Sequence, residues 1–143
     1  MKKSAHCSLT AAPTGTRARA RARVPAGAAV RILCADFFTC ALPEADFSLV
    51  YERTFVCALD PARWAAVTRR ITALLRPGGR WVGLFYEGPK EDGPPFGWDR
   101  DEAEQLLGAQ LVPEATLPVP PAESPALFAG RERWREWRRP VGS

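Results

Sequence analysis

Three short segments of this 143-residue chain combine residue types that bind ligands. The first is Ala35–Phe38, in which the Asp36 carboxylate can accept hydrogen bonds from an amine or a hydroxyl and the two phenyl rings offer stacking surfaces. The simpler alternative is that Asp36 is a turn residue and that the two phenylalanines belong to the core. The second is Tyr51–Thr54, where Glu52 and Arg53 could clamp a zwitterion because arginine binds carboxylates bidentately. An internal Glu–Arg ion pair is the equally simple alternative.

The third segment is Gly93–Trp98, with the sequence Gly-Pro-Pro-Phe-Gly-Trp. Its prolines stiffen the backbone and its glycines permit sharp bends. We expect this loop to present Phe96 and Trp98 over a pocket, although a Gly/Pro loop can also do no more than connect two elements.

The patterns around these segments predict alternating strands and helices. Short apolar runs at Val30–Ala35, Phe47–Tyr51 and Arg80–Tyr86 are typical of buried strands. Asp60 and Pro61 form a helix start, with an acid at the cap and proline at the first helical position. The helix is predicted to be amphipathic, since apolar residues recur at three- and four-residue steps: Trp64, Val67, Ile71, Leu74 and Leu75. Pro77-Gly78-Gly79 is expected to end it.

The rest of the chain continues the same alternation. Asp99 can cap a short acidic helix through Leu107, 110–112 is a candidate strand, 113–125 is expected to be irregular, and 131–139 forms a last element. This order predicts an α/β fold with a mostly parallel sheet. Because ligands bind beyond the carboxyl ends of strands in such sheets, all three segments stand where a site would form.

Charge is distributed unevenly along the chain. The formal net charge is +4, but residues 1–35 carry seven basic side chains and no acid, while the remaining residues are mildly acidic. We expect 1–29 to be a disordered basic tail and 30–143 to be the folded domain. A transit peptide or a nucleic-acid-binding arm remain alternatives for the tail. Nucleic acid is not expected as a partner of the domain, because such binding needs a basic face on the fold.

Composition also bears on metal and location. The four cysteines form no CxxC pair and there is one histidine, so no metal site is expected. Reduced thiols are typical of a cytoplasmic protein. No apolar stretch is long enough to span a bilayer, so no membrane partner is expected.

Taken together, the segments resemble the thiopurine S-methyltransferase family of class I S-adenosylmethionine-dependent methyltransferases. The resemblance covers roughly residues 30–139 and is carried by the order of four motifs: Asp36-Phe-Phe, Phe47 through Leu59 (FSLVYERTFVCAL), Leu74-Leu-Arg-Pro-Gly-Gly, and Gly93-Pro-Pro-Phe. The closing run 130–139 looks like the last strand of that family.

The resemblance implies a partial Rossmann-like class I methyltransferase sheet. It implies methyl transfer from S-adenosyl-L-methionine to a thiol or similarly soft small-molecule acceptor, with no metal and no catalytic side chain assigned. The residues implied for the cofactor are Ala35, Asp36, Phe37 and Arg53. Those implied for the acceptor, in the loop over its pocket, are Pro95, Phe96 and Trp98.

The sequence departs from this family near its start. The family's first βα unit carries a Gly-rich loop for the methionine part of the cofactor and then an acid for the ribose, whereas Gly15 and Gly27 are the only glycines before Asp36 and no acid precedes it. We therefore expect the chain to lack the first two strands and their helices, and to be an N-terminally truncated or frame-disrupted member, inactive in this form, with 1–29 outside the fold. Phe47–Tyr51 would then form an exposed sheet edge. The alternative function is a non-catalytic, methyltransferase-like binding or assembly partner that pairs through that edge; the oligomeric state is left open.

Overall fold

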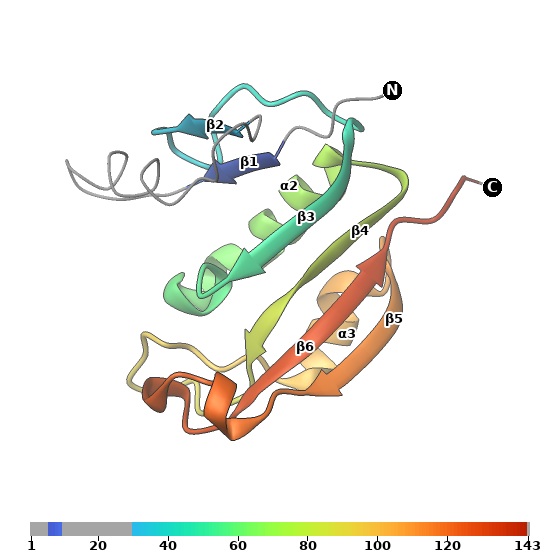
Figure 1. Cartoon of the computed structure of the whole chain (residues 1–143). Coiled ribbons are helices and arrows are strands. Elements are labelled where there is room, and N and C mark those ends of the chain that lie inside the picture. Colours follow the sequence, from blue (N-terminus) through green and yellow to red (C-terminus); the bar gives the residue numbers. More distant parts are fainter. Residues whose placement is uncertain (1–5, 10–29, 143) are drawn as a thin grey trace. The chain divides into compact units, whose positions relative to one another are not determined.

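The computed structural model describes residues 6–9 and 30–142 of the chain (Figure 1). They belong to two compact units, one ending at Ala41 and one beginning at Leu42, and each is described by itself. In the first unit, β1 (His6–Leu9) pairs in parallel with β2 (Val30–Leu33). The disordered tail expected over 1–29 stays a prediction: within it the structure describes His6–Leu9 as β1, and the rest of that segment lies outside the described residues. The predicted strand at 30–35 is confirmed by β2.

The second unit contains a four-stranded sheet in the order β3-β4-β6-β5. Its strands are β3 (Phe47–Arg53), β4 (Leu75–Tyr86), β5 (Val112–Pro118) and β6 (Glu132–Arg138). β3 and β4 are parallel because a helical crossover joins them, whereas β6 runs antiparallel to both β4 and β5. The expected mostly parallel pairing is therefore wrong for this sheet, in which one of three neighbouring pairs is parallel.

Two helices follow the predicted caps. The Asp60 side chain accepts a hydrogen bond from the Ala62 amide at 2.9 Å, and a turn of 3₁₀ helix, η2 (Pro61–Arg63), leads into α2 (Trp64–Leu74). Asp99 accepts from the Asp101 amide at 2.8 Å at the start of α3 (Arg100–Leu107). Both predicted helix starts are confirmed. α2 ends three residues before Pro77, because Leu75 already adopts extended backbone and enters β4.

The segment expected to be irregular is more ordered than the prolines suggested. Residues 112–118 form β5, and two short 3₁₀ turns follow, η3 (Pro121–Glu123) and η4 (Ala126–Phe128). A further turn, η1 (Val56–Ala58), comes directly after β3. Proline is compatible with β5 because this strand is at the edge of the sheet, where half of the amides need no partner strand.

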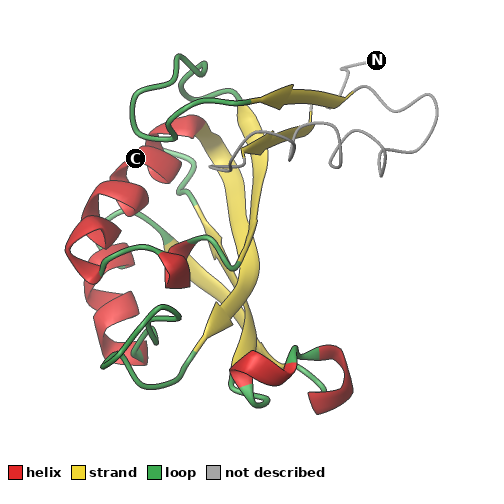
Figure 2. Cartoon of the chain, turned by 90° about the vertical axis from the view of Figure 1, so that its left-hand side faces the viewer, coloured by secondary structure: helices red, strands yellow, loops and turns green. Residues whose placement is uncertain are grey.

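α2 and α3 cover the same face of the four-stranded sheet (Figure 2). The core lies between these helices and the sheet and is aromatic. The ring centroids of Trp81 and of Trp137 on the neighbouring strand are 5.4 Å apart, and those of Trp98 and Trp64 of α2 are 5.3 Å apart in a stacked arrangement. These four rings are almost fully buried. They fix the helices against the sheet and so position the strand ends. Within the described residues, no helix is both long and apolar enough to cross a membrane.

Candidate functional site at the carboxyl ends of the parallel strands

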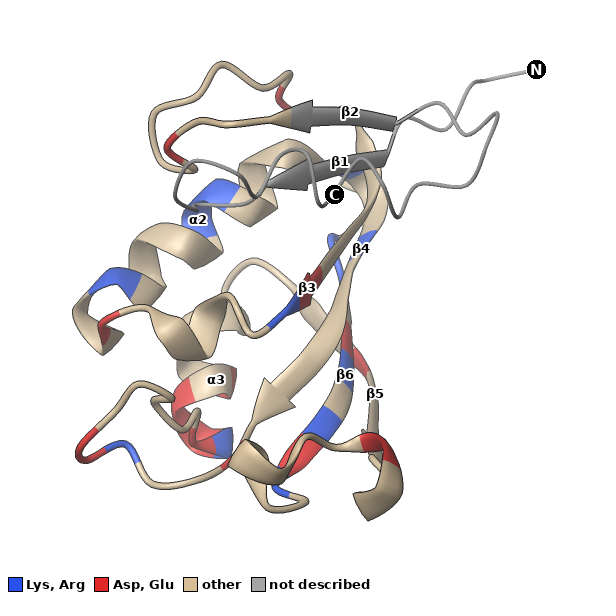
Figure 3. Cartoon of the chain, turned by 60° about the vertical axis from the view of Figure 1, so that its left-hand side comes forward, with Lys and Arg blue, Asp and Glu red and all other residues tan. Residues whose placement is uncertain are grey.

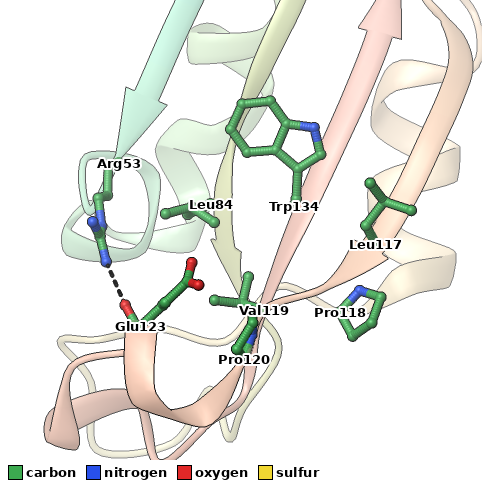
Figure 4. Close-up of a pocket in the computed structure, with 8 residues that line it drawn as sticks. All are labelled: Arg53, Leu84, Leu117, Pro118, Val119, Pro120, Glu123 and Trp134. Carbon is green, nitrogen blue, oxygen red and sulfur yellow. Dashed lines mark hydrogen bonds between the residues drawn. The ribbon is translucent and has the colours of Figure 1, made fainter.

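A pocket of about 430 Å³ lies at the end of the sheet where β3 and β4 finish. The strand register builds its floor, because Arg53 pairs with Leu84, Leu84 pairs with Trp134, and Trp134 pairs with Leu117. Side chains directly opposite one another share a face of a sheet, so these four form one row across the strands. The pocket is completed by Pro118, the last residue of β5, and by Val119, Pro120 and Glu123 of the segment that follows (Figure 4).

Arg53 supplies the positive charge at this pocket. Its Nη2 donates a hydrogen bond to the backbone carbonyl of Glu123 at 3.3 Å and lies 3.8 Å from the Glu132 carboxylate. The Glu132 side chain is 1% exposed, and its Oε2 accepts no hydrogen bond among the described residues. Arg53 is therefore contacted from two sides, and its side chain is still 38% exposed to solvent.

Glu52 faces the opposite side of the sheet from Arg53, because successive residues of a strand alternate. Its Oε2 accepts hydrogen bonds from the amides of Phe55 and Val56 at 3.1 and 3.3 Å, and it lies over Gly83, where an added Cβ would come within 3.0 Å of its Cγ. Burial raises the pKa of Glu52 to about 7, more than these hydrogen bonds lower it, and the nearby Glu132 charge raises it further. Glu52 and Arg53 thus form no joint clamp; Arg53 pairs with Glu132 instead.

The expected acceptor loop contacts the turn that follows β3. The Phe96 amide donates to the carbonyl of Cys57 at 2.7 Å, so the Gly-Pro-Pro-Phe segment lies against η1. Burial and the Glu52 charge raise the pKa of the Cys57 thiol to about 11. The third segment thus contacts the turn that follows the second one, and none of its residues lines the pocket beside Arg53.

Trp98 is not where the sequence placed it. We expected Trp98 to cover a pocket, yet its side chain is 4% exposed and stacks within the core. Its amide donates to the carbonyl of Tyr86 at 2.7 Å, and its ring packs against those of Trp64, Trp81 and Phe85. Pro95 and Phe96 are half-buried, and their contact with an acceptor stays a prediction.

Ala35–Phe38 lies in the first unit. Asp36 Oδ1 accepts from the Phe38 amide at 2.7 Å, and the Asp36 carbonyl accepts from the Cys40 amide at 2.9 Å. Ala35 and Asp36 are exposed, whereas Phe37 is buried and packs edge-on against Phe38. Because Arg53 belongs to the other unit, the expected convergence of Asp36 and Arg53 on one cleft stays a prediction.

Glu132 is the residue of this site that sequence reasoning missed. It begins a strand in which charged and aromatic residues alternate, Glu-Arg-Trp-Arg-Glu-Trp-Arg, and nothing in that pattern separates Glu132 from Glu136. Figure 3 shows basic and acidic positions mixed along β6. Only the register places Glu132 beside the ends of β3 and β4, where it is buried. No group of three potential metal ligands occurs in residues 6–9 and 30–142.

The thiopurine S-methyltransferase (TPMT) family model matches residues 4–140. The chain belongs to this family. It is 36% identical over 83 residues to a thiopurine S-methyltransferase of Vibrio vulnificus, and this match covers 57% of this chain and 37% of that protein. It is 34% identical over 76 residues to probable thiol methyltransferase 2 of Arabidopsis thaliana, and this match covers 52% of this chain and 33% of that protein. The chain therefore spans less than half the length of these curated relatives.

Solved structures of methyltransferases share the fold. One is the 1,6-didemethyltoxoflavin-N1-methyltransferase of Burkholderia thailandensis, with a TM-score of 0.71 and 20% identity, covering 94% of this chain and 60% of that one. Another is a SAM-dependent methyltransferase of Methanosarcina mazei, with a TM-score of 0.73 and 9% identity, covering 96% and 83%. The expected Rossmann-like methyltransferase fold is confirmed.

Proposed function

We propose that this chain works in S-adenosylmethionine-dependent methyl transfer to a thiol or similarly soft nucleophile on a small molecule. The observation that carries the proposal is the family match over residues 4–140. The names of the relatives support the acceptor class, since they include thiopurine and thiol methyltransferases. A cytoplasmic location would fit the three described cysteines, which are free thiols.

The pocket at the ends of β3 and β4 suits a soft acceptor. Leu84, Trp134 and Val119 provide apolar contact, and the Arg53 guanidinium provides positive charge at one side. A nearby positive charge favours the thiolate form of an acceptor, which is its nucleophilic form. S-adenosylmethionine, when bound, supplies a methyl group already activated on a positive sulfur, so the protein has mainly to bind and align the two reactants.

The described residues fit this cofactor in part. The exposed Asp36 carboxylate, with the Phe37 and Phe38 rings beside it, is suited to the adenine end. Arg53, at one side of the pocket, would contact the cofactor next to the acceptor. No acid precedes Asp36 in the sequence, and the glycines before it are Gly15 and Gly27. Groups for the ribose and the methionine part are therefore not matched among these residues.

Calorimetric titration with S-adenosylhomocysteine tests the proposal. We expect binding in the micromolar range, weakened about 5- to 150-fold in Arg53→Ala through loss of a charged hydrogen bond worth ~1–3 kcal/mol. Arg80→Ala is the matched control, because Arg80 is also an exposed strand arginine paired with a glutamate, 3.2 Å from Glu136, but lies away from the pocket. Absence of binding by the folded chain would refute the proposal. An unchanged dissociation constant in Arg53→Ala would remove Arg53 from the site.

A further inference from the structure

The turn that follows β3 has a strained backbone. Thr54 has a φ of 64°, a left-handed conformation that a β-branched residue rarely adopts. Such strain persists only where surrounding contacts fix the backbone, and it is concentrated at functional sites. Here the contacts bridge Thr54, because Oε2 of Glu52 accepts hydrogen bonds from the amides of Phe55 and Val56 at 3.1 and 3.3 Å. The Glu52 carboxylate therefore holds this turn closed.

The neighbouring strand leaves room for the Glu52 side chain. Glu52 pairs with Gly83 of β4, where an added Cβ would come within 2.5 Å of the Glu52 carbonyl oxygen and 3.0 Å of its Cγ. Glycine is the residue that permits so close an approach. Burial raises the pKa of Glu52 to about 7, so its charged form costs stability at this position. A functional task explains such a carboxylate better than packing does.

The turn held by Glu52 contacts the loop that is implied for the acceptor. This turn includes η1, which is fixed on its other side by α2, because Nε1 of Trp64 donates to the carbonyls of Val56 and Leu59 at 3.1 and 3.2 Å. The carbonyl of Cys57, in the middle of η1, accepts from the Phe96 amide at 2.7 Å. A continuous path of hydrogen bonds and backbone thus leads from the carboxylate at the end of β3 to Phe96.

The end of the same loop is held independently of Glu52. The Trp98 amide donates to the carbonyl of Tyr86, the last residue of β4, and the Trp98 ring is stacked in the core. Loss of the Glu52 carboxylate should therefore release Phe96 and leave Trp98 in place. All of these residues belong to the unit that begins at Leu42, so the path needs nothing from the other unit.

We propose that Glu52 is a positioning residue for the methyl acceptor, whose carboxylate fixes η1 and, through η1, fixes Phe96 in the acceptor loop. The proposal rests on the proposed methyl transfer and on the contact with an acceptor that is predicted for Phe96. Glu52 itself touches neither reactant. It orders the loop before the acceptor arrives, so that less conformational freedom is lost on binding.

Amide hydrogen exchange, resolved by residue with NMR, tests the positioning. Glu52→Leu keeps the bulk and removes the acceptor oxygens, so the amides of Val56 and Phe96 should exchange about 10- to 100-fold faster while that of Trp98 changes less than about threefold. Glu52→Gln is the matched control, because its side-chain oxygen can still accept both hydrogen bonds, and it should protect Phe96 as the wild type does. Unchanged exchange of Phe96 in Glu52→Leu, or equal acceleration in Glu52→Gln, would overturn the proposal.

Circular dichroism identifies a variant that fails to fold, and exchange in the wild type is then decisive. The amides of Val56 and Phe96 should open as one unit, with opening equilibria that agree within about threefold, whereas the Trp98 amide opens separately. Opening equilibria of Val56 and Phe96 that differ more than about tenfold would overturn the proposal.

Steady-state methylation of thiophenol tests the link to the acceptor. Glu52→Leu is expected to raise KM for this thiol about 5- to 10-fold, and Glu52→Gln to keep it near the wild-type value. Equal KM values in the three proteins would overturn a role in acceptor binding. Calorimetry with S-adenosylhomocysteine separates this result from failure of the proposed function, because the exchange measurements need no cofactor and decide the role of Glu52 in the loop in either case.

Discussion

The Arg53 guanidinium lies 3.8 Å from the buried carboxylate of Glu132 and joins the end of β3 to the start of β6. These residues are 79 positions apart in the sequence, and the antiparallel placement of β6 beside β4 brings them together. The ion pair leaves the arginine on the pocket side of the sheet. Arg53 therefore has a structural role in addition to its proposed role in binding.

Removing Arg53 should leave the Glu132 carboxylate buried without its ion-pair partner. We expect Arg53→Ala to lower the free energy of unfolding by about 1–2 kcal/mol, and Arg53→Ala/Glu132→Gln to recover most of that loss. Urea unfolding measures both. Arg80→Ala removes a more exposed pair with Glu136 and should cost less than about 1 kcal/mol. Equal losses in the single and double variants would contradict a coupling between Arg53 and Glu132.

Glu52 should make stability depend on pH. Its pKa is raised to about 7 in the folded chain, so its favourable contribution is complete below about pH 4.5 and is lost as pH rises through 7. Glu52→Gln keeps the shape and removes the charge, so the variant should gain up to about 3 kcal/mol on the wild type between pH 5 and pH 8. Urea unfolding across this range measures it, with the exposed Glu91→Gln as control. Parallel curves for wild type and Glu52→Gln would refute the prediction.

Cys57 should react slowly with iodoacetamide. With a pKa raised to about 11, its thiolate fraction at pH 8 is about 0.1%, against roughly a quarter for an ordinary thiol with a pKa near 8.5. Alkylation in the folded chain should be at least ~100-fold slower than in urea, as followed by peptide mass spectrometry. Glu52→Gln removes a charge that raises this pKa and should speed the reaction. Similar rates in folded and unfolded chain would be incompatible with the described environment.

Trp98 should behave as a core residue. Trp98→Ala is expected to lower the free energy of unfolding by about 3–5 kcal/mol, because it removes a stacked ring between α2 and the sheet. Phe96→Ala, at a half-buried position two residues earlier, should cost about 1–2 kcal/mol. Thermal and urea unfolding compare the two. A Trp98→Ala variant with wild-type stability and a changed affinity for acceptor would restore the original expectation of a pocket residue.

Local sequence determined much of the fold. Asp60 and Asp99 cap helices that begin where each acid and its neighbours predict, because an N-cap is a contact between residues a few positions apart. The strands predicted at 47–51 and 80–86 from their apolar runs lie within β3 and β4, for the same local reason. The family could also be identified from sequence, since its motifs are short and ordered along the chain.

Tertiary structure decided the site. The burial of Glu132, the separation of Glu52 and Arg53 onto opposite faces, and the inward turn of Trp98 depend on strand register and on backbone contacts far along the chain. A strand pattern has a period of two and does not state which neighbour a residue faces. The order β3-β4-β6-β5, with β6 inserted antiparallel, is a long-range arrangement that places Arg53, Leu84 and Trp134 in one row, and it was fixed by packing of the aromatic core.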